Sequence, residues 1–281
     1  MRVMGRETTA AKRDIELLDA VYRRGLRRFL ARLAGIGESH WRGQAGEGFH
    51  QALAHLAVAQ ENGLQLIRAS LAGRVTLPPS RNGAASEADL TDRPPTGLLA
   101  LIEQLVEEQL AIMIHLPDDG LLETPAIVPE WSRPGNLGRL YDHLYVHLVF
   151  HYEELRTQVG DPPLLHWFEE WMPEASNDFY DRLFRLFPLI YRPRPPGEGE
   201  TAEHAPETIC VDLMQPGGGR WTLLLDQQAA RVELGCEGPA TSTIKGKPRE
   251  FFDFLRGEGK RVKVSGGRQA GRNLGTLFPL A

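Results

Sequence analysis

The sequence has little of what marks a secreted or membrane protein. Only two of its 281 residues are cysteines, Cys210 and Cys236, and neither belongs to a Cys-x-x-Cys pair. Two cysteines are too few for a disulfide scaffold, so we expect both to be buried and reduced, in a reducing compartment. Residues 1–13 lack the apolar core of a signal peptide, and no stretch approaches 18 apolar residues. The sequence therefore predicts a cytoplasmic protein with no membrane span.

An excess of positive charge is also missing. The formal net charge is −5, the pI is about 6.0, and no basic stripe stands out, whereas nucleic-acid-binding proteins carry such a stripe. The chain has no internal repeat and no His-Glu-x-x-His motif, so the metalloprotease chemistry of that motif has no support. We expect a small-molecule substrate as partner, neither nucleic acid nor a membrane, and a monomer or homodimer.

The first two thirds of the chain contain apolar residues at helical spacing. Glycines and prolines end the periodic runs. The pattern predicts four long helices at residues 8–33, 48–71, 96–115 and 136–159. Amphipathic helices joined in this way are typical of a four-helix bundle. An aromatic-rich segment follows at 166–191, which Pro173 is expected to divide.

The hydrophobic period changes after residues 192–206, whose composition (RPRPPGEGETAEHAP) is typical of a linker. Beyond it, alternating apolar residues predict strands, with one helix among them. The strands are expected around 209–213, 221–225, 232–234, 240–244 and 261–265, and the helix at 247–256. We therefore predict a two-domain α+β protein, with a helical bundle at 8–191, a linker at 192–206 and a small α+β domain at 207–281.

Three of the nine histidines, His143, His147 and His151, follow one another at intervals of four residues on the predicted fourth helix. On a helical wheel, His147 and His151 lie about 20° either side of the inward-facing Leu140. His143 lies about 60° from that line, nearer the rim. Two imidazoles one turn apart can bind the same ion, and Glu154 lies beside His147 on the wheel, where its carboxylate can accept a ring N–H. The pattern predicts a metal site completed from another helix.

The third ligand is not fixed by this pattern. His50 and His55 on the second helix are both candidates. Two small residues, Ala52 and Ala59, flank His55 and leave room for an ion. His115 lies near the end of the third helix, at a less suitable height. The alternative interpretation is that these histidines are hydrogen-bonded core residues, because His-x-x-x-His alone is not a specific motif.

Two passages, HWRGQAGEGFHQALAHLAVAQENGLQLI at 40–67 and LYDHLYVHLVFHYEEL at 140–155, resemble motifs of the DinB-like superfamily. That superfamily of helical bundles includes mycothiol-dependent maleylpyruvate isomerase and the bacillithiol S-transferases. The resemblance implies that the metal ligands are His55, His147 and His151. It places His143 at a non-ligand position, and the pair His143 and His147 is the fallback choice.

A third passage, residues 219–267, resembles the C-terminal domain of the maleylpyruvate-isomerase branch, which is related to sterol-carrier-type folds. Arg256 and Arg261 lie where that branch has basic residues, so the resemblance makes them candidates for binding a carboxylated substrate. The alternative is that both are ordinary surface charges.

The activity that the resemblance implies is that of a metal-dependent isomerase or S-transferase. It would use zinc or nickel and a low-molecular-weight thiol such as mycothiol or bacillithiol. The substrate would be a small electrophile, which in one form of the hypothesis carries a carboxylate. The sequence identifies no catalytic residue beyond the metal ligands. Two alternatives stay open. In the first, the chain is a non-catalytic metal-binding protein. In the second, it binds an apolar ligand beside Phe251, Phe252 and Phe254.

Overall fold

A computed structural model describes residues 44–74, 90, 92–116, 120–129, 131–159, 173–191, 206–226, 229–257, 261–266 and 274. Within these ranges the side chains of 44–49, 122, 152–159 and 173–176 are outside the description. The helix predicted at 8–33 and nearly all of the linker predicted at 192–206 also lie outside it. The chain divides into two compact units, a helical unit (Met1–Val128 and Pro134–Leu164) and a sheet unit (Pro129–Arg133 and Leu165–Ala281).

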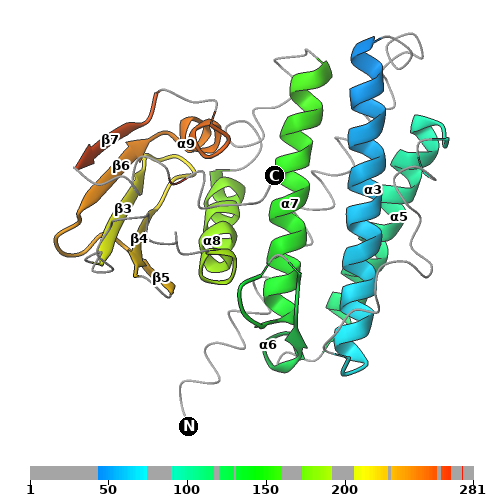
Figure 1. The fold of residues 1–281 in the computed structure, drawn as a ribbon, viewed down its shortest axis with the longest axis horizontal. Coiled ribbons are helices and arrows are strands. Elements are labelled where there is room, and N and C mark those ends of the chain that lie inside the picture. The colour runs from blue at the N-terminus through cyan, green and yellow to red at the C-terminus, as the bar shows by residue number, and fades with distance from the viewer. Residues whose placement is uncertain are drawn as a thin grey trace, which may run out of the picture. The chain divides into compact units, whose positions relative to one another are not determined.

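Three long helices form most of the described part of the helical unit (Figure 1). They are α3 (Gln44–Leu71), α5 (Pro95–Ile114) and α7 (Leu137–Val159), and α3 packs against both of the others. The short helix α6 (Gly120–Glu123) and a hairpin of β1 (Pro125–Ala126) and β2 (Gly135–Asn136) connect α5 to α7. These helices coincide closely with three of the four predicted ones, and the four-helix bundle itself stays a prediction.

Buried hydrogen bonds join the three helices across a largely apolar core. The Tyr141 hydroxyl on α7 donates to the carbonyl oxygen of Gln109 on α5, at 2.8 Å. The Gln109 side-chain amide in turn donates to the carbonyl oxygen of Gln60 on α3, also at 2.8 Å. Because polar groups are costly to bury without partners, these bonds favour one arrangement of the helices over alternatives that leave the groups unpaired.

The sheet unit contains a five-stranded sheet in the order β5-β4-β3-β6-β7 (Figure 1). Its strands are β3 (Glu207–Leu213), β4 (Arg220–Leu225), β5 (Ala230–Leu234), β6 (Ser242–Gly246) and β7 (Lys263–Gly266). Only the β3–β6 pair is parallel, and α9 (Pro248–Leu255) follows β6. The predicted strands and helix at 247–256 are all present, and the mixture of helix and sheet bears out the α+β class.

Helix α8 (Pro173–Ile190) belongs to the sheet unit. Residues 166–191 were predicted to belong to the bundle, but the aromatic side chains of α8 pack on the sheet. The ring centroids of Phe184 and Trp221 are 4.9 Å apart. The Trp221 indole N–H donates to Asp181 at 2.7 Å, and the Tyr180 hydroxyl donates to the carbonyl oxygen of Pro248 at 2.5 Å. The chain therefore divides before α8.

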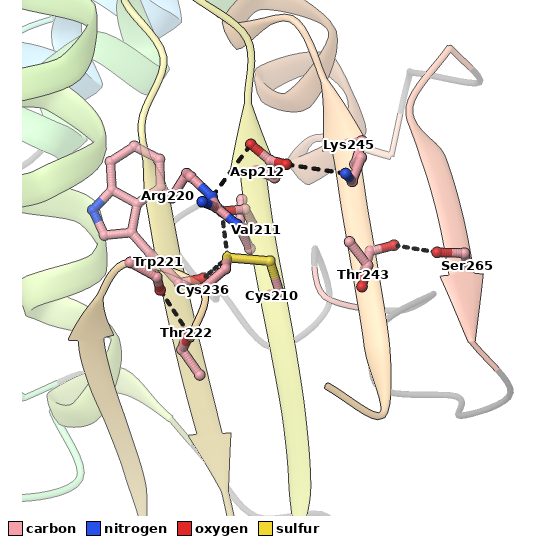
Figure 2. Close-up of a disulfide and its surroundings, with 11 residues drawn as sticks. Cys210, Val211, Asp212, Arg220, Trp221, Thr222, Cys236, Thr243, Lys245 and Ser265 are labelled. Carbon is pink, nitrogen blue, oxygen red and sulfur yellow. Dashed lines mark hydrogen bonds and ion pairs between the residues drawn. A yellow bond between two sulfur atoms is a disulfide. The ribbon is translucent and has the colours of Figure 1, made fainter. Parts of the chain in front are cut away.

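The two cysteines form a disulfide in the sheet unit (Figure 2). Cys210 lies on the central strand β3, and Cys236 follows the edge strand β5. The backbone turns back at Gly235, whose φ is +90°, and brings the two Cα atoms to 5.5 Å, a separation that a disulfide requires. The prediction that both cysteines are reduced is wrong, because a separation of 26 residues does not reveal that the turn returns the chain to β3. The cysteines therefore no longer support the prediction of a cytoplasmic location, which had assumed that they are reduced.

In the described part of the chain, no helix combines the length and the apolar character needed to cross a bilayer.

Candidate metal centre

Three imidazoles from two helices converge in the helical unit. Helix α3 carries His55, and helix α7 carries His147 and His151 one turn apart. The two helices lie side by side (Figure 1). The potential ligand atoms of all three lie within 4.8 Å of one another. The Nε2 atoms of His147 and His151 are 3.0 Å apart, so these two rings point their outer nitrogens at one place.

The ring positions bring His55 closer to His151 than to His147. Its ring centroid lies 4.7 Å from that of His151 and 6.1 Å from that of His147. Nitrogen ligands about 2.0–2.1 Å from one tetrahedral ion are about 3.3 Å from each other. The pair on α7 is already near that spacing, and a ring nitrogen of His55 lies within 4.8 Å of both. The donor set, three nitrogens with no carboxylate, fits a divalent transition metal.

The surroundings favour the neutral form of the central imidazole, His147. His151 is only 8% exposed, and His55 and His147 are half-buried. Burial is the largest cause that lowers the pKa of His147 well below 6.5, and the three neighbouring histidines lower it further. The neutral imidazole is the form that binds a metal. At neutral pH the centre therefore offers ring lone pairs without first having to release a proton from His147.

A glycine lets α3 approach α7 beside the centre. A Cβ atom placed on Gly63 would lie 3.0 Å from Cδ1 and 3.2 Å from Cγ of Leu144, and nearer still to Cδ2. Gly63 lies two turns after His55, and Leu144 lies about one turn before His147. The two helices therefore run in opposite directions with a close contact next to the histidines. Gly63 was not among the residues predicted from the sequence to shape the site, and the available signal was a glycine in the interior of an apolar helical pattern.

The other candidate histidines lie outside the converging group. His50 has its Nε2 atom 2.8 Å from the carbonyl oxygen of Arg93. His115 ends α5, and its Nδ1 atom is 2.6 Å from the carbonyl oxygen of Ala111. His143 is not one of the three converging residues, but its ring stacks beside that of His147.

The remaining candidates are less informative. Glu154 lies on α7, and its side chain is outside the described residues. Arg256 is the C-cap residue of α9, and Arg261 is an exposed residue before β7; both are in the sheet unit. Their substrate-binding role stays a prediction.

Comparisons with known proteins reveal similarity to solved structures. No protein-family model matches the chain, and no match is found among curated proteins. Two solved structures are similar over 91% of this chain and 94% of theirs, each with a TM-score of 0.51 and 14% identity. They are the mycothiol-dependent maleylpyruvate isomerase and a histidine-to-alanine variant of it. At this identity the similarity shows the fold alone.

Proposed function

We propose that this chain is a metal-dependent isomerase or S-transferase that uses a low-molecular-weight thiol on a small electrophilic substrate. The observation that carries the proposal is the convergence of His55, His147 and His151 from two helices. The fold that the chain shares with a mycothiol-dependent isomerase supports it. We propose zinc or nickel as the metal and mycothiol or bacillithiol as the thiol.

His55, His147 and His151 would hold the ion through ring nitrogens. Because none of these ligands carries a negative charge, the ion would keep its full 2+ charge and would attract an anionic group. When bound, such an ion would lower the pKa of a thiol or a water molecule, so that a nucleophile exists at neutral pH. Partial burial of the three side chains limits competition from bulk water and strengthens the electrostatic attraction.

The first test is the metal content of the purified protein and of two variants. We expect about one ion per chain for the wild type and less than about a tenth of that for His147→Ala, because two nitrogen ligands hold a metal much more weakly than three. The matched control is His115→Ala, which removes an exposed histidine outside the converging group and is expected to retain the metal. Full metal retention in His147→Ala would show that the ligand assignment is wrong.

A second test separates an enzyme from a protein that binds metal only for stability. The metal-loaded wild type is mixed with small electrophiles, carboxylated and uncarboxylated, in the presence of mycothiol, bacillithiol or glutathione. We expect turnover that depends on both the thiol and the metal and is lost in His147→Ala. Binding of metal without turnover for any thiol would favour the non-catalytic interpretation. If a preference for carboxylated substrates disappears in Arg256→Ala or Arg261→Ala, the substituted arginine binds the substrate carboxylate.

Two of the three phenylalanines that are candidates for an apolar site, Phe251 and Phe252, are better explained as core. Phe251 and Phe252 are both 0% exposed. The Phe251 ring centroid lies 5.6 Å from that of Tyr180 and 6.1 Å from that of Phe184, both on α8. Side chains already packed against other rings do not require a ligand to cover them. The metal-centred function is therefore the better supported of the two.

A further inference from the structure

The ring of His147 has a second neighbour on its own helix. The His143 ring lies one turn earlier on α7, with its centroid 5.9 Å from that of His147 and the two planes only 19° apart. This is an offset-stacked arrangement. His151, in contrast, meets His147 edge-on, at 4.2 Å and 68°. His147 therefore has one histidine packed along its face and another at its edge.

This arrangement matters because an imidazole must be oriented before it can bind a metal. Its lone pair lies in the ring plane, so rotation of the ring moves the lone pair away from the ion. In its present tilt the His147 ring holds its Nε2 atom 3.0 Å from that of His151. A flat ring stacked nearly parallel to His147 opposes rotation out of that plane, because rotation would give up the stacking contact.

We infer that His143 is a positioning residue, which holds the His147 ring in its metal-binding plane by packing against the ring face. The inference rests on the proposed metal centre and adds a role for a residue that is not one of the converging ligands. It assigns the effect to the flat shape of the His143 ring and not to its nitrogens.

The test measures cobalt(II) binding to the full chain with four residues at position 143. His143→Phe keeps a flat ring without nitrogens, His143→Leu keeps most of the volume without a flat ring, and His143→Ala removes both. We expect the Phe variant to match the wild type within about twofold, and the Leu and Ala variants to release cobalt to a chelator about 3- to 10-fold faster, the range that one aromatic pair is worth. His115→Ala is the matched control.

A spectrum gives a readout that general destabilisation does not change. The visible absorption bands of bound cobalt report the geometry of its ligands. We expect the bands of His143→Phe to coincide with those of the wild type, and the bands of His143→Leu and His143→Ala to shift or broaden. Circular dichroism establishes that each variant is folded, and the Phe–Leu comparison stands even where the Ala variant fails to fold.

Each other outcome overturns the inference in a recognisable way. If His143→Phe releases cobalt as fast as His143→Ala, a ring nitrogen is required and His143 acts as a ligand or hydrogen-bonding group. If all three variants behave like the wild type, His143 has no positioning role. If the wild type itself binds no cobalt, the proposed metal centre fails, and the inference fails with it; the first two outcomes leave the metal centre intact.

Discussion

Gly63 sets the distance between α3 and α7 beside the histidine cluster, and a methyl group at this position would press into the buried side chain of Leu144. We expect Gly63→Ala to lower the free energy of unfolding by about 1 kcal/mol, because overpacking of about 1–3 kcal/mol exceeds the gain in helix propensity. Urea unfolding followed by circular dichroism measures the change.

Gly97 on α5 provides the control for that substitution. A Cβ atom there would meet only Pro94, at 3.6 Å, which is an ordinary contact. Gly97→Ala is therefore expected to stabilise the protein by up to about 1 kcal/mol. Equal effects of the two substitutions would mean that α3 and α7 do not approach as closely as the structure has them.

Because of Tyr141, the stability of the helical unit is expected to change with pH in the alkaline range. Burial raises the pKa of its hydroxyl far above the ordinary value of 10. The folded protein therefore keeps this proton while the unfolded chain releases it above pH 10, so the stabilisation is complete below that pH and decreases as the pH rises beyond it. We expect stability to fall above pH 10 by up to about 1.4 kcal/mol per pH unit from this group.

The variant Tyr141→Phe isolates this contribution. It lacks the hydrogen bond to Gln109, so at pH 7 it should be about 0.5–1.5 kcal/mol less stable than the wild type. Unfolding free energies measured from pH 8 to 11 should converge for the two proteins as the pH rises. A constant difference over that range would show that Tyr141 ionises normally in the folded state.

The histidine cluster shows what a sequence can and cannot specify about a site. The four-residue spacing of His147 and His151 is enough to place both on one face of a helix, because helix geometry is fixed locally. The choice between His50 and His55 depends on how α3 is rotated against α7. That rotation follows from packing such as Gly63 against Leu144, which no local pattern shows. Only the family resemblance selected His55.

At the scale of elements, helices and strands were predictable because each has its own hydrophobic period. The assignment of α8 was not, because its apolar and aromatic residues would serve equally well in a bundle or on a sheet. The disulfide was missed for a related reason. It depends on the order β5-β4-β3 and on the turn at Gly235, which place Cys236 beside Cys210.

The disulfide is expected to stabilise the sheet unit by closing a loop in the unfolded chain. For cysteines 26 residues apart, that constraint amounts to about 3.5 kcal/mol. The double variant Cys210→Ser/Cys236→Ser should lose about this much in urea unfolding without reductant. Dithiothreitol should bring the wild type to the stability of the variant and leave the variant unchanged. A wild type whose unfolding ignores reductant would show that the bond does not form.

At the scale of the whole molecule, α8 should decide whether the sheet unit folds as a separate fragment. A fragment of residues 165–281 keeps the helix whose Tyr180 and Phe184 cover Trp221, with centroid distances of 6.1 and 4.9 Å. A fragment of residues 207–281 begins at β3 and leaves the fully buried Trp221 and Phe251 without that cover. We expect a cooperative urea transition for the longer fragment and none for the shorter one.

The substitution Phe184→Ala in the longer fragment links this expectation to packing. It removes a buried ring that contacts Trp221, which costs about 3–5 kcal/mol in a well-packed core. That loss is comparable to the whole stability of a small unit, so the variant fragment should resemble the shorter one. If residues 207–281 unfold as cooperatively as residues 165–281, α8 is dispensable to the sheet, and the domain boundary lies after it, where composition alone had placed it.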